Sequence, residues 1–282
     1  KKMQSLIEQL NEARDSYYNK SESIMKDYEF DSLFNELQHL EKQTETVYNN
    51  SPTHTVGYEV KSKLEKVTHS HPMLSLGKTK STQDLIEFAG EKDCILSLKM
   101  DGLTVLLVYD NGTLTQAETR GNGEVGELIT HNAKVFENIP TSIKYQGHLE
   151  VEGEAIITYS DFDKINENIP DENKYKNPRN LVSGSVRQLD SNIAAERHIK
   201  FVCWKVPEIE NKIENNNSFL HRLKDVEKLG FEIVPLLTYT NNSSDKDNME
   251  DMIDNLKKQA SDKGYPIDGL VLTFNDISYG NS

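Results

Sequence analysis

Residues 94–119 constrain the fold of this chain more than any other stretch. Residues 94–100 form an apolar run, and the apolar-rich segments 103–109 and 113–119 flank the turn tripeptide Asp110-Asn111-Gly112. Asn-Gly is preferred in tight turns between antiparallel strands, because both residues tolerate a positive φ. The pattern therefore predicts a β-hairpin, preceded by a strand that ends near Lys99.

Other segments have the length and periodicity of further strands and helices. Strands are predicted at 149–157, 201–206, 232–238 and 269–274, and helices near 81–89, 219–229 and 248–260. Gly230 and Gly264 stand where two of these helices would end. Strand clusters interrupted by surface helices, without regular alternation of the two, predict an α+β domain of mainly antiparallel sheets.

The first 47 or so residues have a different pattern. Apolar residues recur there at helical spacing, in one run from Met3 to Leu10 and a second from Phe30 to Leu40, which predicts a helical hairpin. Residues 49–52, Asn-Asn-Ser-Pro, break the pattern. A chain of 282 residues can bury a sizeable core, so we expect a small helical domain at 1–58 and one large domain at 59–282.

Composition limits the partners and the compartment. The chain carries 32 Lys and Arg against 46 Asp and Glu, a formal charge of −14, so stand-alone binding to DNA should be weak unless basic residues gather in one cleft. Cys94 and Cys203, the two cysteines, lie in apolar strand-like runs that indicate buried thiols in a reducing compartment. No apolar run approaches membrane-spanning length, and the start lacks the features of a signal peptide. We expect a cytoplasmic monomer with no membrane partner, cut from a longer protein.

The chemical centre of the sequence is Lys99-Met100-Asp101-Gly102, at the end of a predicted strand. A lysine in this setting can act as a nucleophilic amine, but an unperturbed lysine is only about 0.1% neutral near pH 7.5, a handicap of roughly 4 kcal/mol. Desolvation or a nearby cation would favour the free amine. The candidate cations are Arg120, Arg179, Arg187 and Arg197. Taken alone, the motif is a modest signal, and the alternative is an exposed lysine before a turn.

Further motifs follow this lysine in a fixed order. They are Thr119-Arg120-Gly121-Asn122-Gly123, Glu152-Gly153-Glu154, Asn177-Pro178-Arg179-Asn180 and Ile267-Asp268-Gly269. Two more segments belong to the set: Pro72-Met73-Leu74-Ser75-Leu76, which precedes Lys99, and the run 184–190, which follows Asn180 closely. Together they resemble the adenylation core of bacterial NAD-dependent DNA ligases, and the resemblance covers essentially the whole chain.

This resemblance implies a covalent mechanism. Lys99 would attack the α-phosphate of NAD, expel nicotinamide mononucleotide (NMN) and hold AMP as a lysyl phosphoramidate, with magnesium as a second cofactor. AMP would then pass to the 5′-phosphate of nicked DNA, gripped by additional C-terminal domains outside this chain. Residues 1–58 would be the NMN-binding domain and 59–282 the nucleotidyltransferase domain.

The resemblance also assigns site residues. Tyr18, Asp27, Phe30 and Asp31 would hold the NMN half, Arg120 the ribose and phosphate side, and Trp204 would stack on adenine. Glu154 would bond ribose hydroxyls or help place Mg²⁺, and Arg179 and Arg187, around a Pro-Arg-Asn-x-x-x-Gly turn, would bind phosphate. The remaining cofactor-binding positions are Ser75, Leu76, Ser97, Asp101, Asp268 and Thr273.

Structural roles compete with several of these assignments. Trp204 could pack in the core without contacting a nucleotide. Asp27 and Asp31 could stabilise the start of a helix, because acidic side chains there interact favourably with the helix dipole. Glu154 could be a solvated residue of an alternating strand, and the arginines could pair with local acids.

The chain also departs from the family pattern. Ser97 stands in place of a glutamate, and Thr273 in place of a lysine that reaches the nucleotide phosphate. These changes motivate one alternative, a degenerate, non-catalytic nucleotide-binding paralogue. An ATP-dependent polynucleotide ligase is a second alternative, because it shares the lysine chemistry, although it has no reason to carry the N-terminal hairpin.

Overall fold

The computed structural model describes residues 2–19, 24–44, 46–48, 50–53, 63–71, 73, 77, 79–210, 217–240 and 249–281, with the backbone alone at 17–19 and 27–28. They form two compact units. Unit 1 comprises Lys1–Met73 with Arg120–Glu127, and unit 2 comprises Leu74–Thr119 with Leu128–Ser282. The predicted domain boundary at residue 58 falls between the described ranges and stays a prediction.

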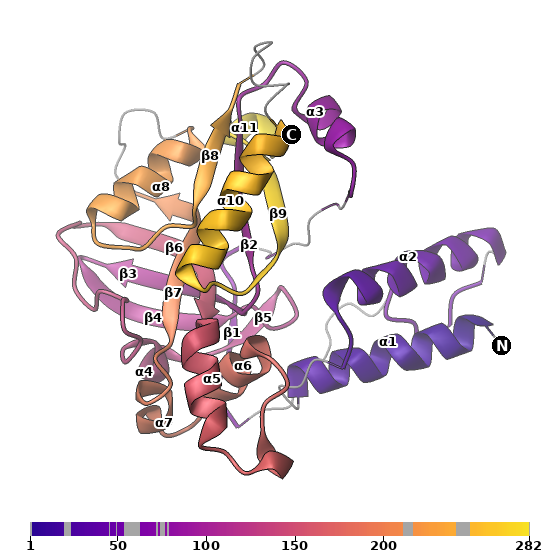
Figure 1. Ribbon diagram of the computed structural model, residues 1–282, viewed down its shortest axis with the longest axis horizontal. Coiled ribbons are helices and arrows are strands. Elements are labelled where there is room, and N and C mark those ends of the chain that lie inside the picture. Colours follow the sequence, from indigo (N-terminus) through magenta and orange to yellow (C-terminus); the bar gives the residue numbers. More distant parts are fainter. Residues whose placement is uncertain are drawn as a thin grey trace. The chain divides into compact units, whose positions relative to one another are not determined.

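Unit 1 contains the predicted helical hairpin. Helix α1 (Lys2–Asn19) packs along α2 (Asp27–Thr44), which confirms the pattern read from the apolar spacing (Figure 1). Its core is formed by apolar side chains at the predicted positions, Leu6, Ile7, Leu10 and Leu37. Strand β1 (Lys66–Thr68) pairs antiparallel with β5 (Val125–Glu127) in the same unit.

Unit 2 is built on two sheets. One has the strand order β8 (Leu236–Tyr239), β2 (Cys94–Met100) and β9 (Ile267–Phe274). The other has the order β4 (Thr113–Thr119), β3 (Leu103–Asp110), β6 (His148–Ile156) and β7 (Lys200–Ile209). All pairs within the two sheets are antiparallel, which confirms the predicted α+β fold with mainly antiparallel sheets.

Helices surround these sheets. They are α3 (Thr82–Ala89), α4 (Thr130–Ala133), α5 (Tyr159–Glu167), the short 3₁₀ helix η1 (Asp171–Asn173), α6 (Pro178–Val186), α7 (Ser191–Ala195), α8 (Phe219–Lys228), α10 (Met249–Lys263) and α11 (Ile277–Gly280). Helix α10 lies across the three-stranded sheet in Figure 1 and buries Leu256 and Ala260 in one cluster with Leu96 and Leu98 of β2. The even-numbered residues of β2 therefore face the core beneath α10, and the odd-numbered residues face the other way.

The predicted strand at 232–238 is only partly correct. Strand β8 begins at Leu236, while the backbone at Glu232 and Val234 pairs with Cys203 of the other sheet. Pro235 lies between the two pairings, and its carbonyl accepts a hydrogen bond from the Leu98 amide. Proline lacks an amide proton and interrupts a continuous ladder, so the segment passes from one sheet to the other.

The turn predicted around Arg179 and Arg187 is wrong, because this segment is helix α6. Asn177 caps it by accepting a hydrogen bond from the Asn180 amide at 2.8 Å, and Pro178 occupies its first turn. An Asn-Pro pair is a helix-start signal, since the asparagine satisfies a free amide and proline has none to satisfy.

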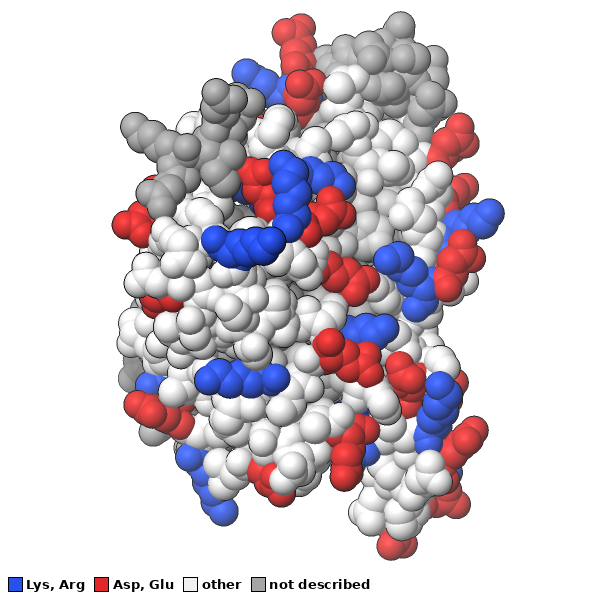
Figure 2. Space-filling view, turned by 90° about the vertical axis from the view of Figure 1, so that its left-hand side faces the viewer, with Lys and Arg blue, Asp and Glu red and all other residues white. Residues whose placement is uncertain are grey.

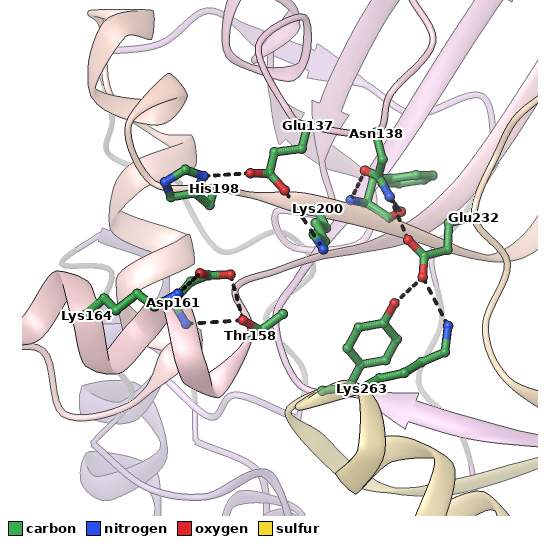
Figure 3. Close-up of polar contacts among 11 residues, drawn as sticks. Glu137, Asn138, Thr158, Asp161, Lys164, His198, Lys200, Glu232 and Lys263 are labelled. Atoms are coloured by element: carbon green, nitrogen blue, oxygen red, sulfur yellow. Dashed lines mark hydrogen bonds and ion pairs between the residues drawn. The ribbon is translucent and has the colours of Figure 1, made fainter.

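A polar network anchors the chain that enters β9. Figure 3 shows Glu232 between Asn138, which donates to it at 3.0 Å, and Lys263 at 3.5 Å, with the Tyr265 hydroxyl as a further donor. Asn138 also exchanges hydrogen bonds with the backbone of Phe201 in β7. The network therefore ties the end of α10 to β7, directly before β9 begins.

Candidate active site

Lys99 lies at an irregularity in the pairing of β2 with β9. Leu98 pairs with Leu270 and Met100 with Ile267, so two residues of β9, Asp268 and Gly269, stand opposite Lys99 alone. This is a β-bulge, and Gly269 adopts φ +115°, a conformation that glycine reaches without strain. The bulge brings the Asp268 carboxylate onto the Lys99 ammonium as an ion pair, with both side chains about 30% exposed.

The Asp101-Gly102 pair is fixed by close backbone packing. The Asp101 amide donates to the carbonyl of Pro266 at 2.9 Å. A Cβ atom at Gly102 would lie 2.0 Å from the carbonyl oxygen of Ala155 in β6, so only glycine fits between the strands. The Asp101 carboxylate in turn forms an ion pair with Arg179 of α6, with Nη1 and Oδ1 3.3 Å apart.

Glu154 completes the cluster from β6. It is 9% exposed, so the alternative of a solvated residue is wrong. Burial raises the pKa of Glu154 to about 7, against the opposing effects of Arg179 and of a hydrogen bond from Thr104. Asp101 and Lys99 also affect this carboxylate electrostatically. The structure therefore brings together five predicted residues: Lys99, Asp101, Glu154, Arg179 and Asp268.

The sequence interpretation missed Thr104. Its hydroxyl donates to Oε2 of Glu154 at 3.1 Å, and the two residues are direct partners in the β3–β6 register. Alternation along β3 places Thr104 on the face of Leu106, but only the strand pairing shows which β6 residue it meets.

Ser97 and Thr273 lie farther along the same two strands. Ser97 is 7% exposed and pairs with Val271 of β9, and Thr273 pairs with Ile95 of β2. Directly paired residues share a face of the sheet, and Ile95, Ser97 and Lys99 alternate onto one face of β2. Ser97 and Thr273 therefore lie on the face of the three-stranded sheet that carries Lys99. Their assignment as cofactor-binding residues stays a prediction.

Trp204 and Arg187 lie on other elements of unit 2. Trp204 is the extra residue of a bulge in β7, between Cys203 and Lys205, and packs half-buried against the core beneath α10. Arg187 is the half-buried residue that ends α6. The predicted adenine stacking by Trp204 and phosphate contact by Arg187 stay predictions.

Arg120 belongs to unit 1. Its Nε donates to the carbonyl of Met73 at 3.2 Å, and its own carbonyl is 2.8 Å from Nε2 of His69. Gly121 and Gly123 beside it have positive φ values of 54° and 96°, as the Gly-flanked loop requires. Its role toward a nucleotide held by unit 2 stays a prediction.

The predicted NMN contacts are also in unit 1. Phe30 packs against the hairpin core and stacks on Phe34 with ring centres 6.1 Å apart, and Asp31 is half-buried on α2. The side chains of Tyr18 and Asp27 fall outside the described part of the chain. So do Ser75 and Leu76 of unit 2, and all of these assignments remain predictions.

The cysteines, the surface charges and the helices bear on the expectations drawn from composition. Cys94 and Cys203 are buried free thiols, as predicted, and burial raises the pKa of Cys94 to about 11 and that of Cys203 as well. On the face drawn in Figure 2, basic and acidic side chains are interspersed. Among the described residues, no helix combines the length and the apolar character needed to cross a membrane.

An antiparallel α+β framework thus presents a Lys-x-Asp-Gly motif beside carboxylates and an arginine. Two family matches identify this class of protein as the adenylation part of a ligase. The NAD-dependent DNA ligase adenylation domain matches residues 61–282, and the DNA ligase-like N-terminal NAD⁺-binding domain matches residues 1–57. The chain belongs to the NAD-dependent DNA ligase adenylation domain family.

Proteins named DNA ligase are similar to nearly the whole chain. The relative from Lachnoclostridium phytofermentans is 46% identical over 278 residues, and the one from Ruminiclostridium cellulolyticum is 46% identical over 281 residues. These alignments cover 98% and 99% of this chain but 42% of each relative, so the chain spans about two fifths of their length. Among solved structures, an archaeal ATP-dependent RNA ligase has a TM-score of 0.42 at 15% identity, with 73% of this chain and 46% of that chain covered.

Proposed function

We propose that this chain carries out the self-adenylation step of an NAD-dependent DNA ligase. Lys99 would attack the α-phosphorus of NAD and form lysyl-AMP. The observation that carries the proposal is the placement of Lys99, in a chain of this family, opposite a β9 bulge and beside Asp101, Glu154, Arg179 and Asp268. These groups are the kind needed to hold a ribose and a phosphate around an amine nucleophile.

In this step one bond forms and one breaks. The Nζ–P bond of the phosphoramidate replaces the bond from the α-phosphorus to the bridging oxygen, which leaves with NMN. The amine attacks in its neutral form, so the ammonium first loses one proton to solvent, and the nitrogen loses a second one as the N–P bond forms. Arg179 would offset the growing negative charge on the phosphate oxygens, and Asp101 fixes its guanidinium.

The cluster also has the donors that a magnesium ion prefers. Glu154 is a buried carboxylate whose pKa Asp101 helps to raise, so the two carboxylates lie close enough to disfavour each other's charge. Hard cations prefer such oxygen ligands, and Glu154 would hold the ion. A bound Mg²⁺ would supply charge neutralisation at the phosphate.

The wider activity rests on the longer relatives. By analogy with them, lysyl-AMP would serve as the donor for a DNA 5′-phosphate, in a protein with further domains that grip nicked DNA. In unit 1, the hairpin would hold the NMN half of NAD and orient it as a leaving group. The cytoplasmic location and the monomeric state are our predictions for the same protein.

Incubation with NAD and Mg²⁺, followed by intact-mass and peptide analysis, tests the proposal. We expect one AMP adduct, located on Lys99, and no adduct with Lys99→Ala. Parallel reactions with ATP distinguish the second ligase class, because preferential labelling by ATP would contradict the use of NAD. Binding of NAD without any adduct, in this chain and in the full-length protein, would instead identify a degenerate nucleotide-binding paralogue.

A further inference from the structure

Thr104 is the polar neighbour of Glu154 across the β3–β6 pair. The register places the two residues directly opposite each other, where side chains on one sheet face are closest. The hydroxyl of Thr104 donates to Oε2 of Glu154 at 3.1 Å. This contact comes from a strand that begins directly after the Lys99-Met100-Asp101-Gly102 motif.

Glu154 needs such a contact because it is buried. Burial disfavours its charged form, and Thr104 is a neutral donor that offsets this effect without adding a charge. A branched side chain on a strand has few accessible rotamers, so its hydroxyl donates in a fixed direction. One carboxylate oxygen of Glu154 is thereby held in place by Thr104.

We propose that Thr104 is a positioning residue that orients the Glu154 carboxylate for its contact with the bound nucleotide. This inference rests on the proposed function, because it assigns Glu154 to the nucleotide site. Thr104 itself touches Glu154, and it acts on the nucleotide only through that carboxylate.

The test compares Thr104→Val, which keeps the shape and removes the hydroxyl, with Thr104→Ser, which restores it. We expect Thr104→Val to raise the NAD concentration for half-maximal adenylation about tenfold, the loss typical when a residue that orients a ligand-contacting side chain is removed. The rate at saturating NAD should change less than threefold, and Thr104→Ser should recover most of the loss. Thr115→Val is the matched control, because the Thr115 hydroxyl donates to Asp110 at 2.8 Å on the exposed end of the hairpin.

A double-mutant cycle separates positioning from structure. In a Glu154→Ala background, which removes the acceptor of the Thr104 hydrogen bond, Thr104→Val should have almost no further effect on the NAD requirement. Additive effects, an unchanged NAD requirement in Thr104→Val, or an equal loss in Thr115→Val would each overturn the inference while leaving the proposed function intact. A wild-type chain that forms no adduct would refute the proposed function, and this role with it.

Discussion

Replacement of Gly102 by alanine should distort the site around Lys99. The new Cβ would lie 2.0 Å from the Ala155 carbonyl oxygen and 3.0 Å from its carbon and from a methyl group of Ile156. Backbone atoms cannot rotate away, so β3 and β6 must separate by about 1.4 Å to reach an ordinary contact of 3.4 Å. Overpacking of this kind costs about 1–3 kcal/mol of stability.

The same displacement acts on catalysis, because Gly102 follows Asp101 and Ala155 follows Glu154. A shift of about 1 Å in a catalytic group lowers the rate about a hundredfold. We expect Gly102→Ala to melt several degrees lower and to adenylate Lys99 about a hundredfold more slowly in single-turnover mass spectrometry.

Gly184→Ala is the matched control, since its Cβ would meet Tyr175 at an ordinary 3.5 Å within helix α6. That variant should gain up to about 1 kcal/mol of stability and melt at a higher temperature, because alanine has a higher helix propensity than glycine. Adenylation in Gly102→Ala at more than a third of the wild-type rate would refute the reasoning.

Three further outcomes follow from other contacts. Arg179→Lys keeps the charge but loses the planar fork beside Asp101, so single-turnover adenylation should slow about tenfold, and Arg179→Gln should slow it further. Glu232→Gln weakens the contacts from Lys263 and Tyr265, and urea titration should show a loss of about 1–2 kcal/mol. The hydrogen bond between His148 and Asp110 raises the pKa of His148 and lowers that of Asp110. Its contribution to stability is therefore fully present between the unperturbed pKa values of the two groups, 3.8 for Asp110 and 6.5 for His148. His148→Asn should therefore lower the melting temperature more at about pH 5 than at about pH 8.5. The loss of stability should stay below about 1 kcal/mol, because the side chains of the pair are partly exposed.

Local patterns were sufficient to predict most elements but not their partners. The Asp110-Asn111-Gly112 turn has positive φ at Asn111 and Gly112, as a tight hairpin requires, and its flanking strands form as predicted. Residues 232–234 were misassigned because their partner is the backbone of Cys203 in β7, outside their local sequence. Helix α6 was missed although Asn177-Pro178 is a local start signal, because the interpretation took the proline and the glycine for a turn.

The candidate site illustrates the same limit. Lys99, Asp101 and Asp268 lie in recognisable motifs, so the sequence could name them. The bulge that sets Asp268 against Lys99 depends on the register of β2 and β9, in which one residue opposes two. The contact between Thr104 and Glu154 likewise depends on strand pairing between residues 50 positions apart.

The state of Lys99 in this structure differs from what its chemistry requires. A nucleophilic lysine needs desolvation or a nearby cation to free the amine, whereas the Lys99 side chain is 29% exposed and paired with the Asp268 carboxylate. An opposite charge in direct contact supplies neither condition. The one arginine placed in the cluster, Arg179, is already paired with Asp101. If Lys99 is the nucleophile, the ion pair with Asp268 must therefore break or exchange partners when the nucleotide binds. Asp268 is well placed for such an exchange, because it lies at the β9 bulge beside Gly269 rather than within a regular ladder.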